Sequence, residues 1–449
     1  MKIRRILVAN RGEIAVRIIR TCRSLGIGAV LAASEADIDA VPARLADHAI
    51  RIGPAKSTES YLNVNAVIEA AKAAKADAIH PGYGFLSENV RLARACSERD
   101  IIFIGPTEAQ LEAVGDKLRA RRHAIEAGLP VVPGGPVSSS TEAEALAEKI
   151  GWPILVKAVG GGGGRGMKLV ADPKRLPQTL ELAMAEAEAA FADSRVYLER
   201  FVASGRHVEV QIIGDGDNVI HLGDRDCSVQ RRYQKLIEEA PAPGLPTKVT
   251  AAMRDAAVAF GRHLKYRSLG TVEFLYDRNR EEFYFLETNA RIQVEHPVTE
   301  AITGLDLVAE QIAIAEGHKL RLRQDEVKFN GHAIECRLNA EDWTRDFRPM
   351  PGIVCTAVFP AGPGVRVDTH IESGSRVPPF YDSLLAKIIV HDVDRSAVID
   401  RLKLALANCD VRGVVTNRDM HVAVLTQPDF VRGGADTAYF RQFLEGREV

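Results

Sequence analysis

The sequence predicts a mixed α/β and α+β protein whose last part is mainly β. Three observations predict this fold class. Helix and strand patterns alternate over about the first hundred residues, five consecutive glycines interrupt an apolar stretch at 160–164, and strand patterns dominate after about Gly331. Alternating strands and helices are typical of a parallel sheet with crossover helices. The length of 449 residues agrees with about three domains.

The first part, residues 1–114, is predicted to be a Rossmann-like domain. Its first turn reads Asn10-Arg11-Gly12-Glu13 and lacks the G-x-G-x-x-G pattern of dinucleotide-binding folds, so a nicotinamide enzyme is rejected. The turn at 80–88 fits an ordinary strand-to-helix connection, with Ser87 as the helix cap. We expect strands at 6–9, 29–33, 78–80 and 101–104, and helices at 13–25, 64–74 and 87–99.

Composition excludes several classes of function. A net charge of −2 and a pI near 6.7 give no basic footprint for nucleic acid or for an anionic membrane surface. No segment approaches the roughly 18 apolar residues of a transmembrane helix. The six cysteines are scattered without a C-x-x-C pair, so we expect neither a zinc site nor a disulfide framework. This pattern indicates a reducing, cytoplasmic compartment.

The glycine run follows Lys157 and lies between two strand-like segments, 152–156 and 167–170. Ordering consecutive glycines is entropically costly, which favours a role for the backbone itself. Converging N–H groups can form a nest for polyphosphate, and the lysine adds a point charge. A flexible linker is the alternative, but strands rarely bracket linkers. We expect residues 131–203 to form a lid subdomain that moves, with helices at 141–149 and 176–190.

Two aromatic and apolar segments, 271–276 and 283–289, predict a β-hairpin. A turn centred near 279–280 places Glu273 opposite Glu287, and Asn289 on the same face. Opposed carboxylates destabilise a sheet unless a cation lies between them, and these oxygen ligands suit Mg²⁺. A solvated face with incidental glutamates is the alternative interpretation.

The segment after the hairpin carries alternating polar residues. In an extended chain Arg291, Gln293 and Glu295 share a face, where they could hold a small oxyanion and take its proton. The charged run 224–235 is expected to be a surface loop. Within that run, Cys227 is interpreted as a small buried residue and not as a nucleophile.

Six segments together resemble biotin carboxylases, which are ATP-grasp enzymes. The segments are 10–15, 80–89, 115–117, 157–167, 225–239 and 291–299, in the order found in that family. The resemblance extends from about residue 3 to 443. It implies an ATP-grasp domain at 115–330, with the glycine-rich mobile lid, and a biotin carboxylase C-terminal domain at 331–449.

Roles are implied only where residues match the family pattern. The implied contacts to ATP come from Lys117, Lys157, Gly162, Gly163, Gly164, Glu199, Arg200, His207, Gln230 and Tyr233. The implied ligands of Mg²⁺, with Mn²⁺ as an alternative, are Glu273, Glu287 and Asn289. Bicarbonate would be bound by Lys235, Arg291, Gln293 and Val294. The resemblance makes Glu295 the general base, places Arg337 against the biotin enolate and puts Tyr83 at the border of the biotin pocket.

The implied reaction is ATP-dependent carboxylation of biotin by bicarbonate through carboxyphosphate. This would be the first half-reaction of an acyl-CoA carboxylase, such as the acetyl-CoA carboxylase of fatty acid biosynthesis. The sequence contains no Met-Lys-Met biotinylation site, so biotin is expected on a separate carrier protein, with carboxyltransferase subunits as further partners. The alternatives are another ATP-grasp ligase that forms an acyl phosphate, and a non-enzymatic nucleotide-binding subunit.

Four positions depart from the usual family pattern. Tyr233 stands where a histidine is usual beside the nucleotide, and Arg200 replaces a lysine. At the implied dimer contact Ser24 and Pro363 differ, whereas Arg20 and Arg366 match. We therefore expect a homodimer and an altered affinity for ATP.

Overall fold

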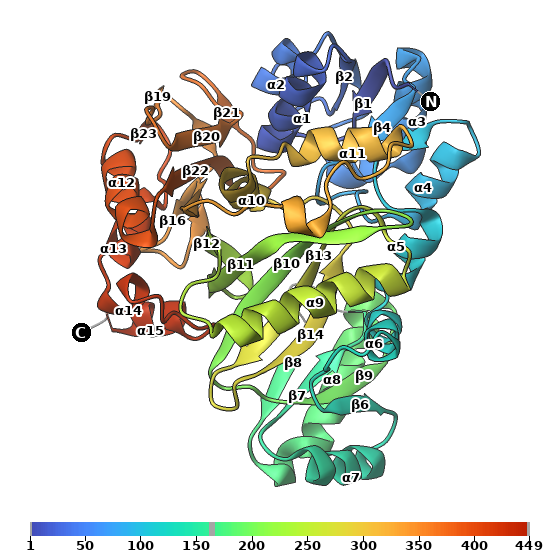
Figure 1. The fold of residues 1–449 in the computed structure, drawn as a ribbon, viewed down its shortest axis with the longest axis vertical. Coiled ribbons are helices and arrows are strands. Elements are labelled where there is room, and N and C mark those ends of the chain that lie inside the picture. Colours follow the sequence, from blue (N-terminus) through green and yellow to red (C-terminus); the bar gives the residue numbers. More distant parts are fainter. Residues whose placement is uncertain (1, 161–166, 447–449) are drawn as a thin grey trace.

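The N-terminal part forms a five-stranded sheet in the order β3-β2-β1-β4-β5. The computed structural model describes residues 2–160 and 167–446 (Figure 1). All neighbouring strands of this sheet run parallel, which confirms the Rossmann-like prediction. The strands are β1 (Arg5–Val8), β2 (Gly28–Ala33), β3 (His48–Arg51), β4 (Ala78–His80) and β5 (Ile102–Phe103).

Helices cover both faces of this sheet because each presents an apolar stripe to one of two buried clusters. The expected helix at 87–99 is shorter, and its predicted cap was wrong. Asn89 caps it by accepting a hydrogen bond from the Leu92 N–H at 3.2 Å, whereas Ser87 closes the preceding turn through its N–H and the Gly84 carbonyl. These helices are α1 (Gly12–Ser24), α2 (Val41–Leu45), α3 (Val64–Ala74), α4 (Val90–Ser97) and α11 (Leu307–Ala315), whereas α5 (Glu108–Gly115) packs in a third cluster beside the central sheet.

An eight-stranded antiparallel sheet forms the centre of the molecule, in the order β14-β13-β10-β11-β12-β15-β22-β20. Helix α9 (Thr247–His263) lies across it (Figure 1). Helix α10 (His296–Thr303) packs against β15. Strands from both sides of residue 330 belong to this one sheet, so the domain boundary predicted at 330/331 stays a prediction. The strands are β10 (Gly205–Asp215), β11 (Val219–Arg231), β12 (Gln234–Ala240), β13 (Arg267–Asp277), β14 (Glu282–Asn289), β15 (His332–Asn339), β20 (Val365–Thr369) and β22 (Leu384–Asp392).

Residues within the predicted lid form their own four-stranded sheet, β6-β9-β7-β8. This sheet and two helices enclose a separate apolar core that includes Ile154, Leu176 and Leu198. Helix α6 (Lys117–Glu126) precedes the unit. Movement of this unit stays a prediction, and Gly162, Gly163 and Gly164 lie outside the described residues. The elements are β6 (Gly134–Val137), α7 (Ser140–Ile150), β7 (Ile154–Ala158), β8 (Met167–Val170), α8 (Leu176–Phe191) and β9 (Val196–Arg200).

The C-terminal part combines short strands with helices that pack on β15 and β22. Helices α12 and α13 begin at Arg395 and Arg418. No helix of the described chain combines the length and apolar character needed to cross a bilayer. The elements are β16 (Glu341–Asp342), β17 (Arg348–Pro349), β18 (Gly352–Ile353), β19 (Thr356–Val358), β21 (Arg376–Val377), α12 (Arg395–Ala407), β23 (Asp410–Arg412), α13 (Arg418–Leu425), α14 (Pro428–Val431) and α15 (Tyr439–Glu445).

Candidate active site

The β13–β14 hairpin pairs Glu273 with Glu287 as the sequence predicted, with a β-bulge between Glu273 and Phe274. Glu273 lies directly opposite Glu287, and Thr271 lies opposite Asn289. The Asn289 amide nitrogen donates to Glu273 Oε1 at 2.7 Å, while its oxygen accepts from Arg291 at 3.0 Å. Burial would raise the pKa of Glu273, but the charges of Lys235 and His207 hold it well below the usual range. Two carboxylates and an amide therefore meet at one end of the central sheet.

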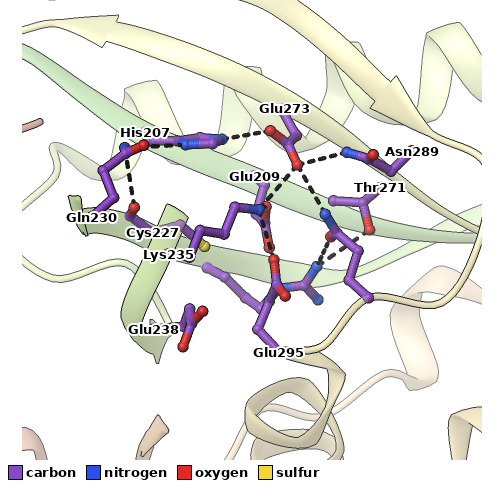
Figure 2. Close-up of polar contacts among 12 residues, drawn as sticks. His207, Glu209, Cys227, Gln230, Lys235, Glu238, Thr271, Glu273, Asn289 and Glu295 are labelled. Atoms are coloured by element: carbon purple, nitrogen blue, oxygen red, sulfur yellow. Dashed lines mark hydrogen bonds and ion pairs between the residues drawn. The ribbon is translucent and has the colours of Figure 1, made fainter. Parts of the chain in front are cut away.

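Lys235 is the cation at the centre of the site (Figure 2). Its Nζ lies 2.6 Å from Glu209 Oε2, 2.6 Å from Glu295 Oε1 and 3.0 Å from Glu273 Oε1. Burial alone would lower the pKa of this ammonium, but the surrounding acidic groups, Cys227 among them, raise it well above its usual value. The lysine is therefore charged and holds three carboxylates from three segments together.

Glu295 lies between two cations. Besides Lys235, it accepts a hydrogen bond from Arg337 Nη2 at 3.0 Å, and its side chain is 2% exposed. Burial would raise the pKa of Glu295, but Lys235, Arg337 and Arg225 together keep it well below the usual range. Without substrate the group is thus a carboxylate, ready to accept a proton once those cations are shared with another anion.

Residues 290–295 are not an extended strand, so the prediction that three polar side chains share a strand face was wrong. The strand ends at Asn289, and the chain turns into α10 directly after Glu295. Arg291 points back to Glu88, with Nε 3.0 Å from Oε2. Gln293 donates to Glu273 at 2.9 Å and accepts from Arg225 at 2.6 Å. Gln293 and Glu295 still lie near Lys235, because the irregular loop between β14 and α10 places them there.

The charged run 224–235 is a strand that is buried through Gln230, followed by an exposed turn at 232–234, so the surface-loop expectation was wrong for the strand. Most of β11 is buried, and the Arg225 side chain is 0% exposed. Arg225 donates to Glu209 at 2.5 Å and also contacts Gln211, Thr271 and Thr299. Buried charges occur where they are paired, and these pairs fix the walls of the site. Cys227 is buried, as expected.

Sequence reasoning missed Glu209 and Glu238 as site residues. Glu238, on β12, accepts a hydrogen bond from Arg337 Nε at 2.6 Å. Burial raises the pKa of Glu238 to about 7, although the Arg337 charge opposes this shift. The sequence did contain a signal for them, because each is a carboxylate inside an apolar strand, Glu209 in β10 and Glu238 in β12. A carboxylate buried in this way needs a cationic partner, which indicates a buried polar site.

The His207 side chain lies between Glu273 on the β13–β14 hairpin and Gln230 on β11 (Figure 2). Its Nε2 lies 2.6 Å from Glu273 Oε2, and its Nδ1 lies 3.5 Å from Gln230 Nε2. Burial would lower the pKa of this imidazole, but the Glu273 carboxylate raises it. The predicted nucleotide contacts His207 and Gln230 are thus neighbours of the predicted metal ligand.

The predicted phosphate-binding lysines lie between the lid and the central sheet. Lys157 pairs with the buried Glu199, and although burial would lower its pKa, this carboxylate raises it. Burial lowers the pKa of Lys117, at the start of α6, while the nearby charge of Glu287 opposes the shift. Arg200 donates to the Tyr284 hydroxyl at 2.6 Å. Both lysines are near carboxylates that ATP phosphates could replace.

The predicted biotin-pocket residue Tyr83 lines a cavity of about 300 Å³ with Phe85 and Tyr381. The Tyr83 hydroxyl contacts Glu13. Lys387 Nζ lies 3.1 Å from the same carboxylate and 2.8 Å from the Val294 carbonyl oxygen. This chain of contacts links the cavity to the loop that carries Glu295.

Tyr233 lies in the turn between β11 and β12, with φ of 68° and a side chain that is 56% exposed. We expect Tyr233→His to bind ATP up to about tenfold more tightly, because an imidazole can carry a positive charge that a phenol cannot, and a charged hydrogen bond contributes about 1 kcal/mol more than a neutral one. We expect kcat to stay within about twofold, since the turn contacts no reacting group. Titration of wild type and variant with ATP measures the difference, and Leu404→His on exposed α12 is the control. Equal dissociation constants would contradict this prediction.

The fold and the site together define an ATP-grasp enzyme: Lys157 on the separate lid sheet and Lys117 at the start of α6 lie near the carboxylate hairpin of a large antiparallel sheet. Comparisons with known families give the same class. Residues 116–323 match the family described as carbamoyl-phosphate synthase L chain, ATP binding domain. Residues 2–111 match the biotin carboxylase N-terminal domain, and 335–442 match its C-terminal domain.

Full-length relatives narrow the class. The biotin carboxylase of Nostoc sp. is 48% identical over 445 residues, covering 98% of this chain and 99% of the relative. A solved biotin carboxylase from Campylobacter jejuni has a TM-score of 0.95 at 44% identity, covering 98% and 99% of the two chains. The biotin carboxylase domain of Hydrogenobacter thermophilus 2-oxoglutarate carboxylase, solved with MgADP and bicarbonate, has a TM-score of 0.94 at 41% identity, covering 99% and 98%. The chain belongs to the biotin carboxylase family.

Proposed function

We propose that this enzyme carboxylates biotin on a separate carrier protein, using ATP and bicarbonate. The observation that carries the proposal is the Glu295 carboxylate held between Lys235 and Arg337, beside the Glu273–Glu287 hairpin. Bicarbonate attacks the γ-phosphoryl group, ADP leaves, and carboxyphosphate forms. Carboxyphosphate then breaks into carbon dioxide and phosphate. Phosphate takes the ureido proton of biotin, and the biotin nitrogen forms the new bond to carbon dioxide.

The hairpin fits a magnesium ion. Glu273 and Glu287 face each other across the strands, and the Asn289 oxygen can join them if its amide turns away from Arg291. Bound Mg²⁺ would neutralise charge on the β- and γ-phosphates. In this proposal Lys117 and Lys157 bind phosphate oxygens as point charges. Glu199, which pairs with Lys157 in this structure, contacts the rest of the nucleotide together with Arg200, His207, Gln230 and Tyr233.

Bicarbonate would bind at the loop after the hairpin, on Lys235, Arg291, Gln293 and the Val294 backbone. An anion on Lys235 shares the positive charge that keeps the Glu295 pKa low. The pKa of Glu295 then rises, and the carboxylate can take the bicarbonate proton as the oxygen attacks phosphorus. Positioning and charge neutralisation supply the rest of the rate increase.

Biotin would enter beside Tyr83 and present its ureido oxygen to Arg337. As the ureido proton leaves, charge develops on that oxygen, and the guanidinium stabilises it as an oxyanion hole would. Glu238 holds Arg337 in place through Nε and Nη2, and Nη2 also donates to Glu295. Closure of the lid would keep water from carboxyphosphate.

The proposal includes a biotin carboxyl carrier protein and carboxyltransferase subunits as partners, and an acyl-CoA as the final acceptor. It also includes a homodimer and a cytoplasmic location. Arg366, one of the matched dimer residues, is held by Glu300 at 2.7 Å, which would fix its side chain for a partner subunit. All six thiols are free, as in a reducing compartment.

We expect ADP release from MgATP to require both bicarbonate and biotin. Free biotin can replace the carrier because the proposed contacts go to its ureido group. The measurement is ADP release with each substrate omitted in turn, at saturating MgATP. Release that ignores biotin would favour an ATP-grasp ligase that forms another acyl phosphate. Absence of ADP release under every condition would contradict the proposed enzymatic activity and favour a non-enzymatic nucleotide-binding subunit.

A further inference from the structure

A second cluster of ligand atoms lies outside the proposed active site, between α6 and α9. His123 Nδ1 lies 3.1 Å from His263 Nε2 and 3.3 Å from Glu126 Oε2. His263 Nε2 lies 3.4 Å from the same carboxylate oxygen. Two imidazole nitrogens and one carboxylate oxygen therefore form a nearly equilateral triangle.

The two helices position this triangle. His123 and Glu126 are three residues apart on α6 and so share one face, while His263 is the last residue of α9. The side chains of His123, Glu126 and His263 are 27%, 48% and 30% exposed. The site is therefore open to an ion from solvent, and one side remains free for water.

The triangle has the size that a tetrahedral metal ion requires. Zn²⁺ binds imidazole nitrogen and carboxylate oxygen at about 2.0–2.2 Å, so two ligands of a tetrahedral ion lie about 3.3–3.5 Å apart. The three edges of the cluster are 3.1, 3.3 and 3.4 Å. Two histidines, one carboxylate and a water are a common set of zinc ligands, and imidazole favours transition metals over Mg²⁺.

We propose that His123, Glu126 and His263 bind one divalent transition-metal ion of the Zn²⁺ class, with water as a fourth ligand. This site goes beyond the proposed function. The ion would cross-link α6 to α9. Because α6 begins at Lys117 and precedes the lid, the cross-link would fix the base of the lid on the central domain. Binding to the folded state would also raise the Tm.

The test is a titration of the full, metal-stripped chain with ZnCl₂ in excess Mg²⁺, followed by calorimetry and by Tm. We expect one tight site per chain and a higher Tm with zinc. His123→Asn combined with His263→Asn should remove that site and the zinc-dependent rise in Tm. Glu126→Gln should weaken zinc binding at least about tenfold. Removing a residue that only hydrogen-bonds to a metal ligand already costs about that much affinity, and Glu126 is itself a proposed ligand. Co²⁺ in place of Zn²⁺ should give the visible absorption of a tetrahedral site.

The matched control is His318→Asn, which removes another exposed histidine that lies 3.4 Å from a glutamate. This control should bind zinc as the wild type does. Two further groups, His207 with Glu209 and Glu273, and Cys227 with Glu209 and Glu295, could also hold zinc. Zinc uptake that is equal in wild type and in the His123/His263 double variant would place the ion there and overturn the proposal. A wild type that takes up no zinc would overturn it as well.

Discussion

Glu295→Gln should lower the kcat for bicarbonate-dependent ADP release by about 10²–10⁴-fold, the contribution that a positioned general base makes. Glutamine keeps the size of the side chain and can still accept hydrogen bonds from Lys235 and Arg337. It cannot take the bicarbonate proton. Steady-state ADP release at saturating MgATP, bicarbonate and biotin measures the loss.

Two features of the site make this variant informative. Lys235 keeps Glu209 and Glu273, and Arg337 keeps Glu238, so neither buried cation loses every partner. We therefore expect the dissociation constant of MgATP to change little. Glu148→Gln, in the exposed part of α7, is the control for loss of a carboxylate as such. An activity within a few-fold of wild type would show that another group takes the proton.

Arg337→Met should lower carboxybiotin formation by about 10²–10³-fold, the cost of removing one donor from an oxyanion hole. Methionine approximates the length of the arginine stem but carries no charge or donor. Nucleotide binding should persist because Arg337 contacts Glu238 and Glu295 and not the lysines near the lid. Carboxybiotin yield and the dissociation constant of MgATP, measured on the same preparation, separate the two effects.

Arg337→Lys distinguishes charge from geometry. Lysine keeps the charge but cannot place two donors in a fixed fork on Glu238 and Glu295, so we expect it to restore only part of the activity. Arg412→Met, at an arginine with 73% exposure, controls for loss of surface charge. Carboxybiotin formation at the wild-type rate in Arg337→Met would overturn the assignment of the enolate-stabilising role.

The sequence predicted the parts of the site that depend on local periodicity. The predicted pairing of Glu273 with Glu287 was correct, but the register set by the turn does not produce it alone: a β-bulge between Glu273 and Phe274 shifts the pairing by one residue. The N-terminal sheet followed from alternating strands and helices. The same reasoning failed at 290–295, where polar residues alternate although the strand has ended at Asn289. Alternation reports which residues share a face only while the chain stays extended.

Contacts between distant strands could not be predicted from periodicity. The run 224–235 was expected at the surface because charged residues usually are exposed. In the structure Arg225 is buried against Glu209 on the adjacent strand, and their pairing is visible only once β10 and β11 lie side by side. Arg337 reaches Glu295 from a strand 42 residues further along the chain, and only the family resemblance indicated its role.

The most direct test of the central claim is transfer of isotope-labelled bicarbonate carbon to free biotin in the presence of MgATP. We predict one labelled carboxybiotin for each biotin-dependent ADP released by the wild type, and essentially none in Glu295→Gln. ADP release that is not accompanied by transfer of labelled carbon to biotin would contradict biotin carboxylation as the function of this site.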